Sequence, residues 1–459
     1  MNTRLSESGG IRAPAANFLT SHPLLFVLVL ALVVRLFIAV ALTRYFSGTL
    51  VLDDTTYHTM AQQMAERETF GWDDFTHQLY WSTAGFMLPI TFLYRVFGPA
   101  PIVGQLFVVL MGTLTAVLVT RLALEFLTHR WAMGAGVVVA LLPSQAFWSS
   151  MLMKDASVWF VLAGLGATVA VGSRATGRHL AILGVAAGGF LVMLSYLRLH
   201  TLVVAAWALM IAAFFGISRD RAARIAGALL LGIMIPWIFG AIGPAGLSLV
   251  TNHGSLEERR FLNAQGASTA IVPTQSEEDG RARQQQLAKA AELEDRALDL
   301  EGSDPARAEK LRIQAQDLRL RAGDARIEPP PAAGAVNEAP LEPNLRHLPR
   351  GLSVMLLEPF PFPFVGSISL RLARLESLLW YPLLALAAIG LWNVRPHLRQ
   401  MAFPLLAGGG VLIMYALSEG NVGTAHRHRG EFVWVVAVLA ALGWSHLRAR
   451  RSATSPEID

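Results

Sequence analysis

Residues 22–42, HPLLFVLVLALVVRLFIAVAL, form an apolar run in which Arg35 is the only Asp, Glu, Lys or Arg. An α-helix of this length crosses the roughly 30 Å hydrocarbon core of a bilayer. The run is too long for the apolar core of a typical secretory signal peptide, and no small-residue cleavage site follows it. We therefore interpret it as a retained first membrane span.

The same pattern recurs along the chain. Of its 459 residues 53% are hydrophobic and only 15% are charged, whereas soluble proteins carry about 25% charged residues. The sequence therefore predicts an all-α, polytopic membrane protein with about ten transmembrane helices. Their predicted positions are 22–43, 102–126, 131–150, 156–172, 180–197, 201–217, 225–242, 375–392, 401–417 and 432–444.

The distribution of basic residues predicts the orientation of these spans. Arg4 and Arg12 place the N-terminus in the cytoplasm, because Lys and Arg favour the cytoplasmic side. The apolar segment 85–98 is short and contains Pro89 and Arg95, so we expect an interfacial helix and not a span. With this choice nearly all basic clusters lie inside. We expect a multi-pass protein of the cell inner (plasma) membrane with both termini cytoplasmic.

This topology divides the chain into five parts. They are a cytoplasmic N-terminus (1–21), a first transmembrane module (22–242) with an extracytoplasmic loop (45–101) that contains an amphipathic helix, an extracytoplasmic insert (243–374), C-terminal transmembrane helices (375–446) and a cytoplasmic tail (447–459).

The large extracytoplasmic insert is polar. Its segment 275–323 is charged and alanine-rich, with leucines at helical spacing, and predicts a helical hairpin. Asp304 and Pro305 suit the N-cap and first turn of the second helix. Residues 329–343 form a proline-rich linker. The hairpin is a candidate surface for a protein partner.

Composition excludes two kinds of site. The chain has no cysteine, which rules out disulfides and thiolate metal sites. Its net charge is +5, but the basic residues lie in short loops between apolar runs. This pattern reflects membrane orientation, so we expect no nucleic-acid partner.

Charged residues beside a membrane are candidates for function because they are costly to place there. The first group is Asp53 and Asp54, followed by Tyr57 and His58. An acidic pair of this kind can act as a general base or hold a cation. The alternative is that one of the two carboxylates caps the helix 55–66.

Two further groups lie at turns on the same predicted face. Lys154 and Asp155 end one outer turn, where they either act on a substrate or form an interfacial ion pair. Arg198 and His200 lie at the next outer turn. Arg198 departs from the orientation rule, although the side chain of a single arginine can also extend towards the headgroups without further function.

The last group is the loop 418–431, SEGNVGTAHRHRGE, which contains His426, Arg427, His428 and Arg429 on the outer face. Guanidinium and imidazole groups suit a phosphate or diphosphate at the membrane surface. A plain charged loop is the alternative. Together with the acids, this loop indicates a reaction between a lipid phosphate and a polar acceptor.

With these residues, the chain resembles the GT-C superfamily of membrane glycosyltransferases, in the branch of the protein O-mannosyltransferases and aminoarabinose transferases (family 39). Three features in roughly the first 200 residues carry the resemblance. They are the doublet in Asp53-Asp54-x-x-Tyr57-x-x-Met60-Ala61, the segment Tyr94-Arg95-Val96-Phe97-Gly98, and Asp155 at the end of LPSQAFWSSMLMKD. The rest matches loosely, through the loop residues Thr424 to Arg429.

The resemblance implies an inverting transfer of a sugar from a polyprenyl-phosphate donor at the extracytoplasmic face, to an acceptor that it does not identify. It implies that Asp53 is the catalytic base, with Asp54 as the other candidate, and that Asp155 positions the acceptor or the base. Arg198 and the cluster 426–429 would contact the lipid-linked phosphate. The family's doublet is commonly Asp-Glu, so no metal ligand is assigned and a divalent metal stays open as a cofactor.

Three alternatives remain: one is an enzyme with a different reaction, and two belong to other classes of protein. A polymerase or ligase would move whole glycans from a polyprenyl diphosphate, and a lipid or glycan transporter would cause no chemical change. Transporters often show paired halves, and no internal repeat is visible in the sequence. A non-catalytic scaffold would depend on the hairpin 275–323 and not on the acids.

Overall fold

The computed structural model describes residues 21–46, 48–67, 83–216, 274–300, 304–321, 344–362 and 368–454. These residues form helices joined by short turns, with no strand among them. The α-helices are α2 (Pro23–Phe46), α3 (Leu52–Glu66), α5 (Ala84–Phe97), α6 (Pro101–Ala123), α7 (His129–Leu141), α8 (Pro143–Trp148), α9 (Asp155–Gly172), α10 (Gly177–Ser195), α11 (Leu199–Gly216), α15 (Thr274–Leu300), α16 (Pro305–Arg321), α17 (Asn344–Leu357), α18 (Ile368–Trp392), α19 (Leu398–Ser418), α20 (Val422–His428) and α21 (Gly430–Thr454), and a 3₁₀ turn, η2, spans Arg395–His397.

Seven helices of the described residues are long and apolar enough to cross a membrane. They are α2, α6, α9, α10, α18, α19 and α21, and α11 is a shorter apolar helix at the next predicted span. The prediction of an all-α polytopic membrane protein is confirmed. The predicted span 131–150 consists of two helices, α7 and α8, because Pro143 starts a new helix. The predicted span 225–242 lies outside the described residues.

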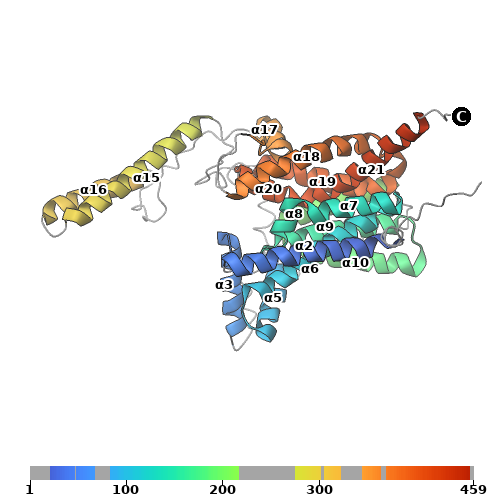
Figure 1. Ribbon diagram of the computed structural model, residues 1–459, viewed down its shortest axis with the longest axis horizontal. Helices are drawn as coiled ribbons and strands as arrows, with labels where there is room; N and C mark the ends of the chain where they lie inside the picture. Colours follow the sequence, from blue (N-terminus) through green and yellow to red (C-terminus); the bar gives the residue numbers. More distant parts are fainter. Residues whose placement is uncertain are drawn as a thin grey trace, which may run out of the picture.

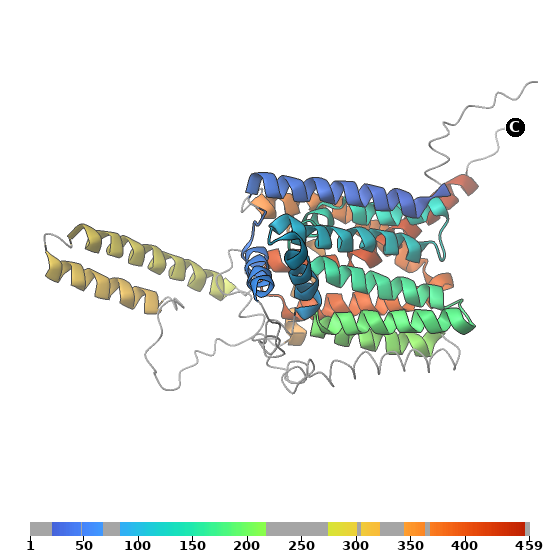
Figure 2. The same ribbon diagram turned by 90° about the horizontal axis from the view of Figure 1, so that it is seen from below.

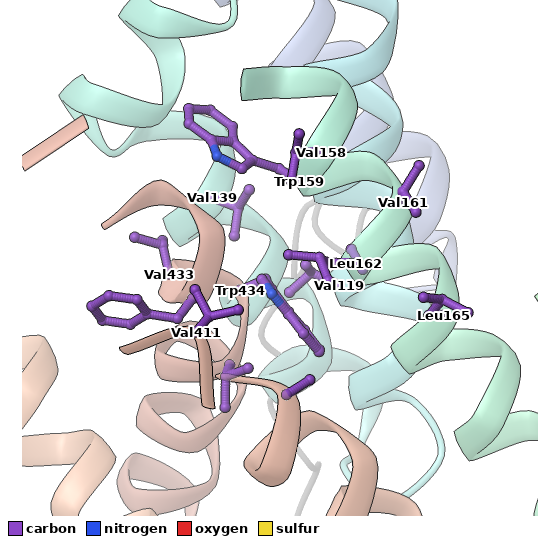
Figure 3. Close-up of a cluster of buried hydrophobic side chains, with 14 of the residues drawn as sticks. Val119, Val139, Val158, Trp159, Val161, Leu162, Leu165, Val411, Val433 and Trp434 are labelled. Carbon is purple, nitrogen blue, oxygen red and sulfur yellow. The ribbon is translucent and has the colours of Figure 1, made fainter. Parts of the chain in front are cut away.

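The spanning helices pack as a bundle around a continuous apolar core. Figure 3 shows part of this core, where Leu162 of α9 lies close to Trp434 of α21. Helices α18 and α21 pack along each other, and their backbones approach most closely at Gly390 and Gly443. A Cβ on either glycine would collide with the partner helix's main chain, so both positions require glycine.

Two short helices close one end of the bundle. In Figures 1 and 2, α3 and α5 lie across the direction of α2, at the end where α8 and α20 are also found. Helix α5 covers 14 residues, as expected for the interfacial segment 85–98. The N-terminal end of α2 and the C-terminal end of α21 lie at the opposite end of the bundle. We call the α3 end the polar end.

Arg35 explains how a charge is accommodated within the first span. Its guanidinium is fully buried and donates to the carbonyls of Val139 (3.0 Å) and Ala140 (3.3 Å), and to the Ser149 hydroxyl (2.7 Å). These carbonyls belong to the last turn of α7, where Pro143 cannot supply an amide donor. Arg35 therefore stabilises the break between α7 and α8.

The predicted hairpin 275–323 is present as α15 and α16, which pack against each other. Asp304 accepts a hydrogen bond from the Arg307 amide (3.1 Å), as expected for an N-cap. The seam differs from the leucine stripe that the sequence suggests, because its buried residues are alanines and Leu298 is 62% exposed. The buried seam residues are Ala290, Ala297, Ala308 and Ala315. The linker 329–343 lies outside the described residues.

Part of the predicted insert belongs to the bundle. Helix α17 packs on α19 and α20, and Gly351 touches the main chain at Ala416. Helix α18 begins at Ile368, seven positions before the predicted span at 375. The division of the chain into five parts otherwise stays a prediction.

Candidate active site

Five separate segments bring charged side chains together at the polar end. They are the start of α3, the α8–α9 junction, the α10–α11 turn, helix α20 and the first turn of α21. Each segment lies at a helix end, because the spans themselves are apolar. The sequence predicted that the first four groups share one face, and the ion pairs below place them together.

Arg427 joins the two acids that the sequence singled out. Its Nη1 donates to Asp53 Oδ2 at 2.7 Å, and its Nε lies 3.6 Å from Asp155 Oδ2. The Asp155 side chain is 1% exposed, whereas that of Asp53 is 47% exposed. Burial alone would lower the pKa of Arg427, but the carboxylates of Asp155 and Asp53 outweigh it and raise the pKa. Arg427 therefore stays a cation.

The hydrogen bonds of this group are incomplete. Among the described residues, the buried atoms Asp155 Oδ2 and Arg427 Nε have no hydrogen-bond partner, since the 3.6 Å between them is too long for one. Buried polar atoms are normally satisfied, so unsatisfied ones need an explanation. A carboxylate oxygen and a guanidinium N–H side by side can bind a ligand that both accepts and donates hydrogen bonds.

Arg198 bridges Asp155 to a buried acid on α21. Its Nη2 donates to Asp155 Oδ1 at 2.8 Å, and its Nη1 donates to the Tyr415 hydroxyl (2.7 Å) and to Glu431. The Arg198 side chain is 5% exposed. Both terminal nitrogens are therefore engaged with the protein. Arg198 is placed to hold Asp155, and its predicted contact with a phosphate stays a prediction.

The two acids of the doublet have different surroundings. Asp54 is fully buried and accepts hydrogen bonds from the amides of Leu50 (2.8 Å) and Val51 (3.0 Å), just before α3. Burial raises the pKa of Asp54, partly offset by these hydrogen bonds. Asp54 thus fixes the start of α3 from the third position of the helix, whose N-cap is Val51, whereas the capping alternative placed one of the two acids before a helix at 55–66. Asp53 faces Arg427.

Tyr57 and His58 point to different neighbours. Burial, then the nearby carboxylates of Asp155 and Asp53, raises the pKa of Tyr57 to about 12, so this phenol lies beside the ion pairs. His58 Nδ1 forms a hydrogen bond of 2.8 Å with the Tyr94 hydroxyl of α5. His58 therefore contributes to the packing of α3 on α5.

Lys154 precedes α9 at the edge of the site. Burial, reinforced by the positive charge of Arg198, lowers its pKa to about 8, although the Asp155 carboxylate opposes the shift. Its ammonium is charged below that pH and becomes neutral above it. Lys154 is the second cation beside Asp155 that could contact an anionic ligand.

The cluster 426–429 divides among several neighbours. His426 Nε2 lies 3.6 Å from Glu376 Oε1, and His428 pairs with Glu419. Arg429 donates to the carbonyls of Met355 (3.0 Å) and Glu358, and its guanidinium lies over the Trp380 ring. Among the residues that the structure describes, Arg427 is the one member of the four that pairs with Asp53 and Asp155. Substrate contacts by the other three stay predictions.

Three buried acids take part in this end of the bundle without having been expected. Glu431 binds Arg198, Glu419 binds His428, and Glu376 accepts a hydrogen bond from the Ser144 hydroxyl at 2.7 Å. His200 approaches the Tyr415 hydroxyl at 3.3 Å. A signal existed for Glu419 and Glu431, since both flank the basic loop, whereas Glu376 is an isolated acid in an apolar span.

The donor set does not form a metal centre. Among the residues that the structure describes, no three His, Asp or Glu side chains converge. Asp53 and Asp155 are the two predicted acids that meet, and the Arg427 guanidinium lies between them, where a shared cation would sit. This arrangement does not fit a divalent ion held by both carboxylates, and no catalytic step is derived through one.

The fold is similar to that of solved archaeal oligosaccharyltransferases. The comparison that shows this is with the archaeal oligosaccharyltransferase AglB from Archaeoglobus fulgidus, in complex with an inhibitory peptide and a dolichol-phosphate. The TM-score is 0.51 and the identity 15%, over 96% of this chain and 53% of AglB.

Two other solved structures are similar. The apo form of the A. fulgidus oligosaccharyltransferase gives a TM-score of 0.50 and 15% identity, over 95% of this chain and 53% of that one. ArnT from Cupriavidus metallidurans in the apo state gives 0.37 and 14%, over 92% and 80%. The chain thus spans about half the length of the oligosaccharyltransferase. No model of a known protein family and no curated protein matches the sequence.

Proposed function

We propose that the protein is a membrane glycosyltransferase that transfers a sugar from a polyprenyl-phosphate donor to an acceptor, with inversion at the anomeric carbon. The observation that carries the proposal is the juxtaposition of Asp53, Arg427 and Asp155 at the polar end of a bundle with the GT-C fold. The dolichol-phosphate bound to the similar AglB structure supports a lipid phosphate as the donor's leaving group.

The residues suit distinct parts of a single displacement. The half-exposed Asp53 carboxylate takes the proton from an acceptor hydroxyl or amine, and the acceptor atom forms a bond to the anomeric carbon. The bond between that carbon and the phosphate oxygen breaks as this bond forms. The charge that develops on the departing polyprenyl phosphate is stabilised by Arg427 and by Lys154 below its pKa of about 8.

Asp155 supports this step by holding Arg427 in place. It is buried, it lies against Arg427, and Arg198 holds its other oxygen. Asp155 therefore positions the phosphate-binding guanidinium, and the choice between the two acids of the doublet falls on Asp53. Asp54 is already engaged by two backbone amides, so it is the weaker candidate for the base.

A second candidate is the transfer of a whole oligosaccharide from a polyprenyl diphosphate. The specific observation in its favour is that the structure at TM-score 0.51 is an oligosaccharyltransferase. The same residues would serve, because a diphosphate leaving group needs the same cations. The length of the transferred glycan, read by gel or mass spectrometry, distinguishes the two.

The site is proposed to face the extracytoplasmic side of the inner membrane. Arg121, Arg174, Arg395 and Arg448 lie at helix ends opposite the polar end, and basic residues favour the cytoplasm. Both termini would then be cytoplasmic. The hairpin of α15 and α16 would extend from the extracytoplasmic side, where it could meet a protein partner or the acceptor.

The test is sugar transfer by the purified full-length protein in lipid nanodiscs. Polyprenyl-phosphate donors with different radiolabelled sugars are offered together with membrane extract as a source of acceptor. We expect label in an acceptor fraction for at least one donor, with release of polyprenyl phosphate in equal amount. Uptake of an unchanged donor into proteoliposomes without transfer would instead indicate a transporter.

A further inference from the structure

Glu431 is a fully buried acid for which the proposed function has no role so far. It lies in the first turn of α21 and accepts hydrogen bonds from the Tyr415 hydroxyl at 2.5 Å and the Thr201 hydroxyl at 3.0 Å. It also accepts from Arg198 Nη1. Three donors from two other helices and a turn meet one carboxylate, so its orientation is fixed.

Glu431 is the inner end of a chain of alternating charges. From the interior to the surface, Glu431 pairs with Arg198, Arg198 with Asp155, Asp155 with Arg427, and Arg427 with Asp53. The side chains of Glu431, Arg198 and Asp155 are at most 5% exposed, whereas that of Arg427 is 21% and that of Asp53 is 47% exposed. The exposed carboxylate of Asp53 is therefore linked, through Arg427, Asp155 and Arg198, to the buried carboxylate of Glu431.

We propose that Glu431 is a positioning residue for the transfer reaction. By holding Arg198 Nη1, it leaves only Nη2 for Asp155, so that Asp155 keeps its second oxygen for Arg427. Arg427 in turn holds Asp53. The inference rests on the proposed function for its effect on turnover, but its structural claim concerns the ion-pair chain alone.

The physical reason is competition for one buried guanidinium. Arginine pairs with a carboxylate most strongly through two parallel hydrogen bonds. Without Glu431, the Arg198 guanidinium turns both terminal nitrogens to Asp155, because a buried charge requires a partner. Asp155 then loosens its hold on Arg427, and the base and the phosphate-binding cation are misplaced relative to each other.

The first experiment compares turnover and substrate binding in Glu431→Gln, which keeps the shape and removes the charge. A misplacement of about 1 Å in a reacting group costs on the order of 100-fold in rate. We expect a fall of that order in kcat with KM for the lipid-linked donor nearly unchanged. The matched control is Glu125→Gln, the same change in an acid that follows α6 and pairs with Arg121 at the opposite end of the bundle.

The second experiment needs no activity. Because the chain has no cysteine, Asp53→Cys provides a single thiol beside Arg427. A neighbouring guanidinium lowers a thiol's pKa and increases its reactivity at neutral pH. N-ethylmaleimide should therefore label Cys at position 53 several-fold more slowly when Glu431→Gln is added, and the pH profile should shift upward. Adding Glu125→Gln should change neither.

Tyr415→Phe is a second variant, which keeps the inference testable if Glu431→Gln does not fold. It removes one hydroxyl between Arg198 and Glu431 and leaves every buried charge in place. We expect the same two effects with smaller size. The inference would be overturned if both variants, Glu431→Gln and Tyr415→Phe, fold and leave the thiol reactivity at position 53 unchanged. This outcome does not depend on whether the protein transfers sugar. A wild-type protein without transfer would overturn only the proposed function.

Discussion

Two arginines distinguish the middle of the bundle from its polar end: Arg35 is fully buried, and the Arg427 side chain is 21% exposed. Arg35 in α2 donates hydrogen bonds to neutral groups, namely a carbonyl of its own helix, two carbonyls of α7 and the Ser149 hydroxyl. Arg427 in α20 pairs with carboxylates from two other segments, and its Nε has no hydrogen-bond partner in the part of the chain that the structure describes. The difference teaches that burial of an arginine indicates structure or function according to its partners.

The largest effect is expected from substitution of Asp53, the acid that is paired with Arg427. Asp53→Asn removes the proposed base and should lower kcat by about 10²–10⁴-fold, with little change in donor KM. Asp54→Asn should keep most of the turnover but lose one hydrogen bond to the backbone, worth about 1 kcal/mol of stability. Steady-state transfer and thermal unfolding measure the two effects. Full turnover in Asp53→Asn would remove Asp53 from the reaction.

The next largest effect is expected at the cation itself. Arg427→Gln removes the group proposed to stabilise the departing phosphate, which should lower kcat by about 10²–10³-fold. It should also weaken the binding of farnesyl phosphate, used as a short polyprenyl phosphate and measured by calorimetry. Arg174→Gln is the control, since that guanidinium is 61% exposed and lies at the opposite end. Equal losses in both variants would contradict a specific role.

Arg35 should show the opposite behaviour. Arg35→Met leaves the carbonyls at the end of α7 and the Ser149 hydroxyl without their donors, at a cost of about 1–3 kcal/mol. We expect a lower Tm in nanodiscs but a turnover per folded molecule close to that of the unchanged protein. A large fall in kcat with an unchanged Tm would show that the comparison of the two arginines fails.

The smallest effect concerns the pH dependence of binding. The pKa of Lys154 is lowered to about 8 from its ordinary value of 10.5, so the folded protein loses this charge as pH rises through 8. Farnesyl phosphate should bind more weakly above pH 8, by a few-fold. The sign for stability is opposite: between pH 8 and 10.5 the unfolded state holds more protons, so unfolding becomes less favourable as pH rises.

A variant that keeps the positive charge at position 154 is the control for this prediction. Lys154→Arg keeps a positive charge across the whole range, so the alkaline loss of binding should disappear in that variant. The other charged groups that act on Lys154 are Arg198, Asp155, Arg427 and Glu431. Calorimetric titrations from pH 6.5 to 9.5 decide the point. The same alkaline loss in both proteins would assign it to another group.

The spans and the convergence of charges were predictable because each depends on simple physics. A bilayer imposes apolar runs of a given length, and the orientation rule then places the polar turns on one face. The break at Pro143 was not recognised, since an apolar run shows no interruption when proline starts a second helix. The place of α17 within the bundle was missed because the sequence assigned residues 344–357 to the polar insert.

The site was only partly predictable. Sequence position identified Asp53, Asp155 and Arg427, yet it could not distinguish Asp53 from Asp54, because which neighbour meets the α3 backbone depends on tertiary packing. Adjacent residues in 426–429 face different directions on one short helix, so a cluster in sequence is divided in space. Glu431 required the structure, because a single acid beside a basic loop does not reveal its partner.

The ion pair between Asp53 and Arg427 joins positions 374 residues apart. At a synthesis rate of about 5–20 residues per second, Asp53 therefore emerges from the ribosome roughly 20–75 s before its counter-ion exists. Throughout that interval the growing chain holds a first helix and an acidic loop but no complete site. The ion pair is thus an end product of membrane insertion, formed only when the late helices dock against the early ones.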